Sequence, residues 1–156
     1  MIPLKSSPLA HYFDEYSDAD LANAQFLTSS EAREVWEKCF ASKARSLYAL
    51  PDDCWVARGS WSVVGPWIDA YNCKIDNGDV SRAISAATTW ASDEPLLFVQ
   101  GSTQIVALDL RSFKKCWRDL LAAFDDGPIL IDRRSRQEAC ALRFVPMGQI
   151  LSFKQA

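Results

Sequence analysis

The order of apolar segments in the last third of the chain limits its fold more than any other feature of the sequence. Two short apolar runs, at residues 96–99 and 105–108, are separated by Gly101-Ser102 and predict a pair of antiparallel strands. A helix is expected next, over about residues 111–124, because apolar residues there recur at three-and-four spacing. Strands are expected at residues 129–131, 139–145 and 149–153. This ββαβββ order predicts an α+β fold, an antiparallel sheet with helices packed mainly on one face.

Two further helices are predicted upstream, which gives about three in all. The first begins at Thr28, where Thr28-Ser29-Ser30-Glu31 matches a capping box, and is expected to end near Arg45 or Leu47. The second covers about residues 79–91. Residues 48–77 are irregular in pattern, with short strands as one interpretation.

The length of 156 residues, with 49% apolar and 24% charged residues, fits a single domain over residues 1–156 with one hydrophobic core. Pro3 and Pro8 predict that residues 1–10 are extended or loosely ordered. No segment approaches the roughly 20 apolar residues of a membrane span. The five cysteines are widely spaced, and we interpret Cys39, Cys116 and Cys140 as buried thiols of a reducing compartment. A cytoplasmic location without membrane contact is therefore expected.

A helix carrying Phe113 and Trp117 is followed by Asp125-Asp126-Gly127-Pro128, a strand, a basic turn with Gln137, and a final hairpin with Phe144 and Gly148. In this arrangement the last third of the chain resembles an uncharacterised family of short bacterial proteins, a domain-of-unknown-function family. The resemblance implies a cytosolic bacterial α+β protein, and it brings no activity, cofactor or catalytic residue.

The sequence contains no recognisable catalytic, cofactor or metal site. His11 is the only histidine, so no histidine-based zinc site or catalytic triad has its partners nearby in sequence. The glycines match no phosphate-binding loop. A net charge of −3 argues against nucleic acid as a partner. The basic run Arg133-Arg134-Ser135-Arg136 is interpreted as a solvated hairpin turn.

Acidic pairs are the main alternative source of chemistry. Asp125 and Asp126 precede a rigid Gly-Pro step, and Asp132 follows across one predicted strand. Two carboxylates can bind magnesium or divide the roles of acid and base. We interpret these residues as a structural turn and keep an acidic enzyme site as an alternative.

The irregular middle contains three tryptophans at six-residue spacing, Trp55, Trp61 and Trp67, just after Asp52-Asp53. They are either part of the core or part of a contact surface flanked by acids. Tryptophan is common in binding hot spots because it buries a large area. With Asp125 and Asp126, these residues form the interaction surface predicted from the sequence.

These observations favour a non-enzymatic protein-binding domain with another protein as its partner. The most specific hypothesis is an immunity-type protein that occludes a toxin, because an acidic surface attracts basic toxins. The alternatives are an enzyme with an unrecognised acidic site and a small-molecule sensor that uses the aromatic middle as a pocket wall. The oligomeric state is left open.

Overall fold

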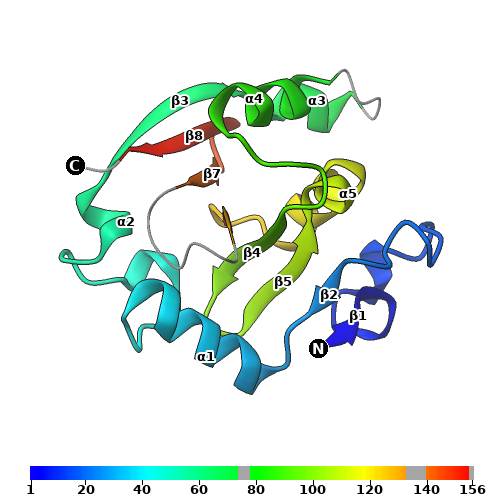
Figure 1. The fold of residues 1–156 in the computed structure, drawn as a ribbon, viewed down its shortest axis with the longest axis horizontal. Helices are drawn as coiled ribbons and strands as arrows, with labels where there is room; N and C mark the ends of the chain where they lie inside the picture. Colours follow the sequence, from blue (N-terminus) through cyan, green and yellow to red (C-terminus); the bar gives the residue numbers. More distant parts are fainter. Residues whose placement is uncertain (74–77, 133–139, 155–156) are drawn as a thin grey trace.

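One eight-stranded antiparallel sheet organises the chain (Figure 1). The computed structural model describes residues 1–73, 78–132 and 140–154. The strand order across the sheet is β1-β2-β5-β4-β6-β7-β8-β3. The strands are β1 (Ile2–Pro3), β2 (Gln25–Phe26), β3 (Ser60–Pro66), β4 (Pro95–Gly101), β5 (Gln104–Asp109), β6 (Ile129–Asp132), β7 (Ala141–Val145) and β8 (Gln149–Lys154).

The α+β class and the predicted C-terminal order are confirmed, since β4, β5, α5, β6, β7 and β8 follow one another along the chain. Strand β3 comes from the irregular middle and pairs with β8 at one edge of the sheet. The described residues also contain five α-helices: α1 (Ser29–Phe40), α2 (Trp55–Arg58), α3 (Ile68–Asn72), α4 (Asp79–Ala87) and α5 (Leu110–Ala123). Three 3-10 turns accompany them: η1 (Leu4–Ser6), η2 (Ala10–Tyr12) and η3 (Leu47–Ala49).

The start of α1 predicted from its capping box is confirmed, whereas the N-cap of α4 is Gly78 and not Asp79, and both helices are shorter than expected. At α1, the Thr28 hydroxyl accepts from the Glu31 amide and the Glu31 carboxylate accepts from the Thr28 amide. The helix ends at Phe40 because Ala41 takes a left-handed conformation, with φ 47°. Helix α4 ends at Ala87, where both the amide and the hydroxyl of Thr88 donate to the carbonyl of Ile84.

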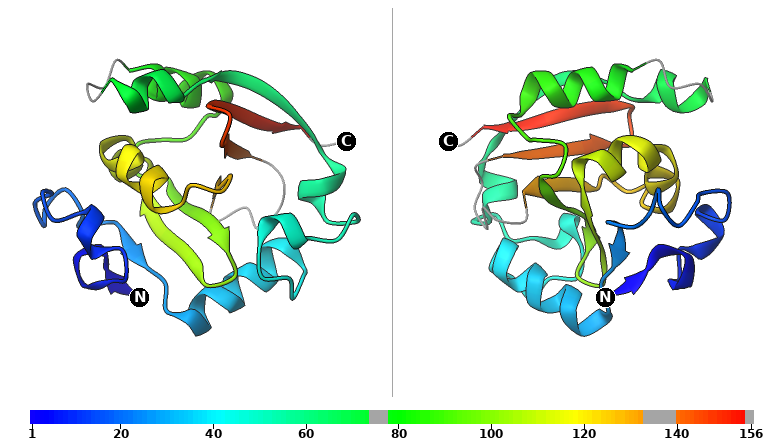
Figure 2. Two further views of the ribbon diagram at one scale, coloured as in Figure 1. Left: turned by 180° about the vertical axis from the view of Figure 1, so that it is seen from behind. Right: turned by 45° about the vertical axis from the view of Figure 1, so that its right-hand side comes forward.

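Helices cover both faces of the sheet, which corrects the expectation that they pack mainly on one (Figure 2). Leu96 and Phe98 of β4 point into a core with α3, α4 and α5. Leu97 and Val99 of the same strand point into a second core with α1 and α2. An uninterrupted apolar strand has side chains on both faces, so both faces need cover. The consecutive apolar residues of the strand therefore account for the two layers of helices.

The N-terminal segment contributes to the fold. Ile2 and Pro3 pair with β2, and Leu4 is 1% exposed in the core that contains α5. Within residues 1–73, 78–132 and 140–154, none of the helices combines the length and the apolarity that crossing a membrane requires.

All five cysteines are free thiols, and their burial differs from the interpretation of the sequence. Cys116 is buried as expected, whereas Cys39 and Cys140 are only half-buried; Cys54 is also buried and Cys73 is exposed. Burial raises the pKa of the Cys116 thiol to about 12, and this thiol donates to the Ser112 carbonyl at 3.1 Å.

This burial predicts a loss of stability in alkali. The Cys116 thiol of the unfolded chain ionises near its ordinary pKa of about 8.5, well below the folded value of about 12. Between these pH values the unfolded state binds fewer protons, so the free energy of unfolding falls as pH rises. Urea unfolding at pH 8 and at pH 10 measures this fall, which is expected to be smaller in Cys116→Ala. An equal fall in both proteins would contradict the assignment to Cys116.

Candidate functional site

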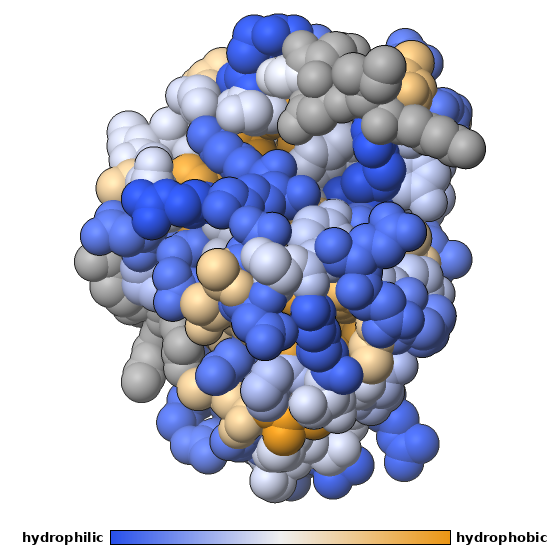
Figure 3. Space-filling model, turned by 90° about the vertical axis from the view of Figure 1, so that its right-hand side faces the viewer, coloured by the Kyte–Doolittle hydropathy of each residue, from blue (hydrophilic) through white to orange (hydrophobic). Residues whose placement is uncertain are grey.

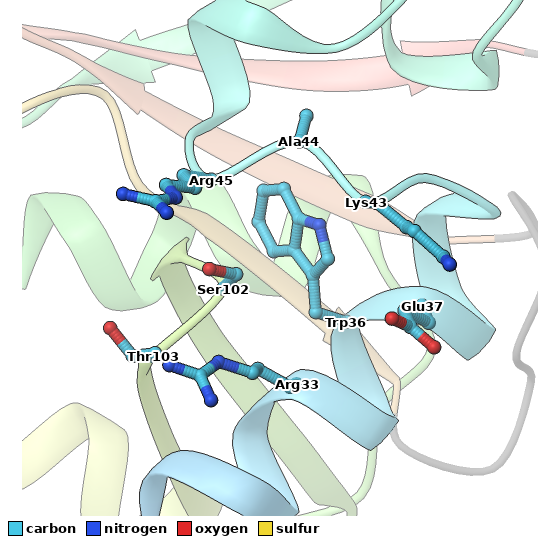
Figure 4. A pocket seen from close by; sticks show the side chains of 8 residues that line it. All are labelled: Arg33, Trp36, Glu37, Lys43, Ala44, Arg45, Ser102 and Thr103. Atoms are coloured by element: carbon cyan, nitrogen blue, oxygen red, sulfur yellow. The ribbon is translucent and has the colours of Figure 1, made fainter.

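A pocket of about 520 Å³ lies between α1, the segment that follows it, and the turn that joins β4 to β5 (Figure 4). Its lining is mostly charged or polar. The residues are Arg33, Trp36 and Glu37 of α1, Lys43, Ala44 and Arg45 of the following segment, and Ser102 and Thr103 of the β4–β5 turn.

Local structure explains why these three segments meet. The left-handed Ala41 ends α1 and redirects the chain, so the next residues run back toward the sheet. There the Arg45 carbonyl accepts from the Ser102 amide at 3.0 Å, and Ser46 forms a β-bridge with Gly101. A Cβ at Gly101 would lie 2.9 Å from the Arg45 carbonyl oxygen, so only glycine permits this close approach. The position of Arg45 beside the turn is therefore set by main-chain contacts.

Positive charge dominates the pocket, in a chain whose net charge is −3. The lining includes three cations, Arg33, Lys43 and Arg45, and one carboxylate, that of Glu37. In the described parts of the chain, no ion pair uses any of these three cations. In Figure 4 the Arg33 and Arg45 guanidinium groups flank the hydroxyls of the β4–β5 turn. Each guanidinium group presents several N–H donors in a planar fork, and each hydroxyl can donate one more hydrogen bond. Together at one end of the pocket, these groups are suited to binding an oxyanion.

The indole of Trp36 forms the inner wall of the pocket. The side chain is 1% exposed, and its N–H has no hydrogen-bond partner among the described residues. By contrast, the indoles of Trp55, Trp61 and Trp67 each donate to a main-chain carbonyl, at 2.8, 3.0 and 3.0 Å. A buried donor without an acceptor costs about 1–3 kcal/mol.

The tryptophans of the interaction surface predicted from the sequence are buried or half-buried. Trp67 is 9% exposed, and Trp55 and Trp61 are half-buried. The rings of Trp55 and Trp61 lie 5.0 and 5.3 Å from the ring of Phe153, so aromatic side chains fill the space between α2 and the sheet. The pocket described above is formed elsewhere, beside α1, and none of these tryptophans lines it.

The acidic members of that predicted surface lie at exposed turns. Asp52 and Asp53 precede α2, and Asp125 and Asp126 follow α5. Asp132 lies at the opposite end of β6 from Asp126, and a strand of four residues spans about 13 Å. The alternative acidic site therefore does not assemble around these carboxylates. In the part of the chain that the structure describes, no group of three His, Cys, Asp or Glu residues is placed to hold a metal ion.

His11 and the basic run at residues 133–136 are the remaining candidate functional residues from the sequence. His11 is exposed, and its ring is tilted by 39° against the ring of Tyr12, with 4.1 Å between ring centroids. The run Arg133-Arg134-Ser135-Arg136 and Gln137 lie outside the described residues. The residues of the pocket were not singled out by the sequence. Their one local signal is the alternation of Lys43 and Arg45 after α1, which says nothing of Arg33 or the β4–β5 turn until the chain folds.

These features define an α+β protein with a two-sided core and a basic pocket at the end of α1. The chain belongs to the family described as protein of unknown function (DUF2947), which matches residues 11–151. The match covers most of the chain, whereas the resemblance noted from the sequence rested on its last third. No curated protein and no solved structure matches the chain.

Proposed function

We propose that this protein is a binding protein that recognises an anionic group of its ligand in the pocket beside Trp36. One observation carries the proposal: Arg33, Lys43 and Arg45 line a single pocket without forming any ion pair within the described residues. Like charges held together repel one another, and a bound anion relieves that repulsion. Guanidinium groups also match the geometry of carboxylate and phosphate oxygens.

The shape of the pocket restricts the ligand further. Its volume of about 520 Å³ lies within the range of small-molecule sites. Trp36 is 1% exposed, so its face is not free to stack on a nucleobase or another flat ring. Recognition therefore depends on charge and hydrogen bonds at the rim. The best match is a small polar molecule with a phosphate, sulfate or carboxylate group.

The protein-binding role predicted from the sequence, with the immunity-type protein as its most specific form, is a separate proposal. The anion pocket neither requires it nor replaces it. Asp52, Asp53, Asp125 and Asp126 support it by their exposure, because exposed acidic side chains can attract a basic partner.

Anion titration of the purified protein tests the proposed pocket. Inorganic phosphate, sulfate and citrate serve as probes at low ionic strength, with calorimetry for affinity and the Trp36 indole N–H resonance as the local reporter. Wild-type protein is expected to bind at least one probe, less tightly as salt increases. The double variant Arg33→Gln/Arg45→Gln is expected to lose about tenfold or more in affinity, since charge-assisted hydrogen bonds contribute about 1.5–3 kcal/mol each.

The matched control is Arg58→Gln in α2, which makes the same chemical change at an exposed arginine outside the pocket. It is expected to bind the anions like the wild type. The proposal fails if none of the three anions binds at low salt, or if the control loses as much affinity as the double variant.

A further inference from the structure

The sheet has two edges, and they differ in their capacity to pair with another strand. At one edge β1 consists of only two residues, Ile2–Pro3. At the other edge β3 runs for seven residues, Ser60–Pro66, and pairs with β8 along one side. Within the described residues no strand pairs with its other side. In Figure 1, β3 is the outermost strand of the sheet.

Sheet edges are usually protected by charges, prolines, bulges or short strands. The β3 sequence, Ser-Trp-Ser-Val-Val-Gly-Pro, contains no charged residue. Its C-terminal end is protected, because the register shifts between Val63 and Gly65 and the strand ends at Pro66. The stretch from Ser60 to Val63, before that shift, contains no charge, no proline and no bulge. An uncharged, regular edge segment is a template for pairing with another strand.

The side chains of this stretch favour the same conclusion. Val63 is 59% exposed, one of few large apolar side chains at the surface of the described residues. It lies on the same face of the sheet as Trp61, because residues two apart in a strand share a face. On the side of the molecule that Figure 3 shows, apolar residues occur only in small patches separated by hydrophilic ones. That view shows the side of the molecule that is on the right in Figure 1, whereas β3 lies at the left and top there. At β3, Val63 adds exposed apolar area to main-chain groups that can pair with a strand.

We propose that β3 pairs antiparallel with β3 of a second copy of this chain, which joins two sheets across a two-fold axis. With the axis at Ser62, Trp61 of each copy lies opposite Val63 of the other, on one face. Aromatic and β-branched residues form favourable cross-strand pairs. A two-fold contact needs a self-complementary surface, and an uncharged segment with Ser and apolar residues in alternation meets that requirement. Because the stretch is short, the dimer is expected to be weak and dependent on concentration.

Sedimentation velocity over a wide concentration range tests this dimer. The mass of the wild type is expected to rise from that of a monomer toward twice that value. Val63→Lys places a charge on each copy beside the axis and is expected to weaken association about tenfold or more, as edge lysines do. Met147→Lys is the control, because Met147 is 92% exposed at the β7–β8 turn, which lies beside the Pro66 end of β3 and outside the stretch from Ser60 to Val63.

Two results would overturn the proposal: a wild type that stays monomeric at its highest soluble concentration, or equal weakening by the two lysine variants. Val63→Lys is expected to bind anions like the wild type, since Val63 does not line the basic pocket. Failure of dimerisation through β3 and failure of anion binding in the basic pocket can therefore be told apart. Circular dichroism of the lysine variants checks that both remain folded.

Discussion

Replacing Phe98 with alanine is expected to lower the free energy of unfolding by about 3–5 kcal/mol. The side chain is 0% exposed in the middle of β4. Its ring centroid lies 5.4, 5.7 and 6.1 Å from those of Phe113, Phe124 and Phe144. The substitution therefore removes a ring that packs between α5 and the sheet. The neighbouring rings belong to a close-packed core, so they can fill the resulting cavity only in part.

Urea unfolding followed by tryptophan fluorescence measures this loss. Met147→Ala is the matched control, because it also truncates a large apolar side chain but at a position that is 92% exposed. Its effect is expected to stay within about 0.5 kcal/mol. Similar losses for the two variants would contradict the central place of Phe98 in the core.

Replacing Gly148 with alanine is expected to lower the free energy of unfolding by about 2–4 kcal/mol. Gly148 has φ +93°, which L-residues rarely adopt, and an added Cβ would lie 2.6 Å from the Cβ of Ile68. The Gly148 carbonyl also accepts from the Trp67 amide at 2.9 Å. The turn between β7 and β8 thus holds the start of α3, and a side chain there would push the two apart.

Gly78→Ala separates the two causes of this loss. Gly78 has a similar φ of +78°, but among the described residues an added Cβ would meet only the flexible end of Arg82. This variant carries the backbone cost alone, about 1–2 kcal/mol. Chemical denaturation of both variants gives the comparison. If Gly148→Ala is no more destabilised than Gly78→Ala, the contact with Ile68 is not a source of the cost.

The candidate pocket was beyond the reach of sequence reasoning for a physical reason. Arg33 and Arg45 are twelve positions apart, and Ser102 is far from both in the chain. Their proximity depends on the left-handed Ala41 and on the pairing of Arg45 with the β4–β5 turn. Gly101 is the one residue whose identity these contacts require, and a single glycine is not a motif, because main-chain hydrogen bonds otherwise do not depend on side-chain identity. The tryptophans gave the stronger sequence signal, and Trp55 and Trp61 pack against Phe153 while half-buried. Their part in binding another protein stays a prediction.

The C-terminal ββαβββ order, the α+β class and the start of α1 at Thr28 were determined by the sequence alone. These features depend on periodicity and capping, which act between residues only a few positions apart. The tertiary structure alone decided the division of the core between two faces, the place of β3 at the edge beside β8, and the grouping of Arg33, Arg45 and Ser102 around one pocket. Each of these results from contacts between distant segments, whose partners are selected only when the whole sheet packs.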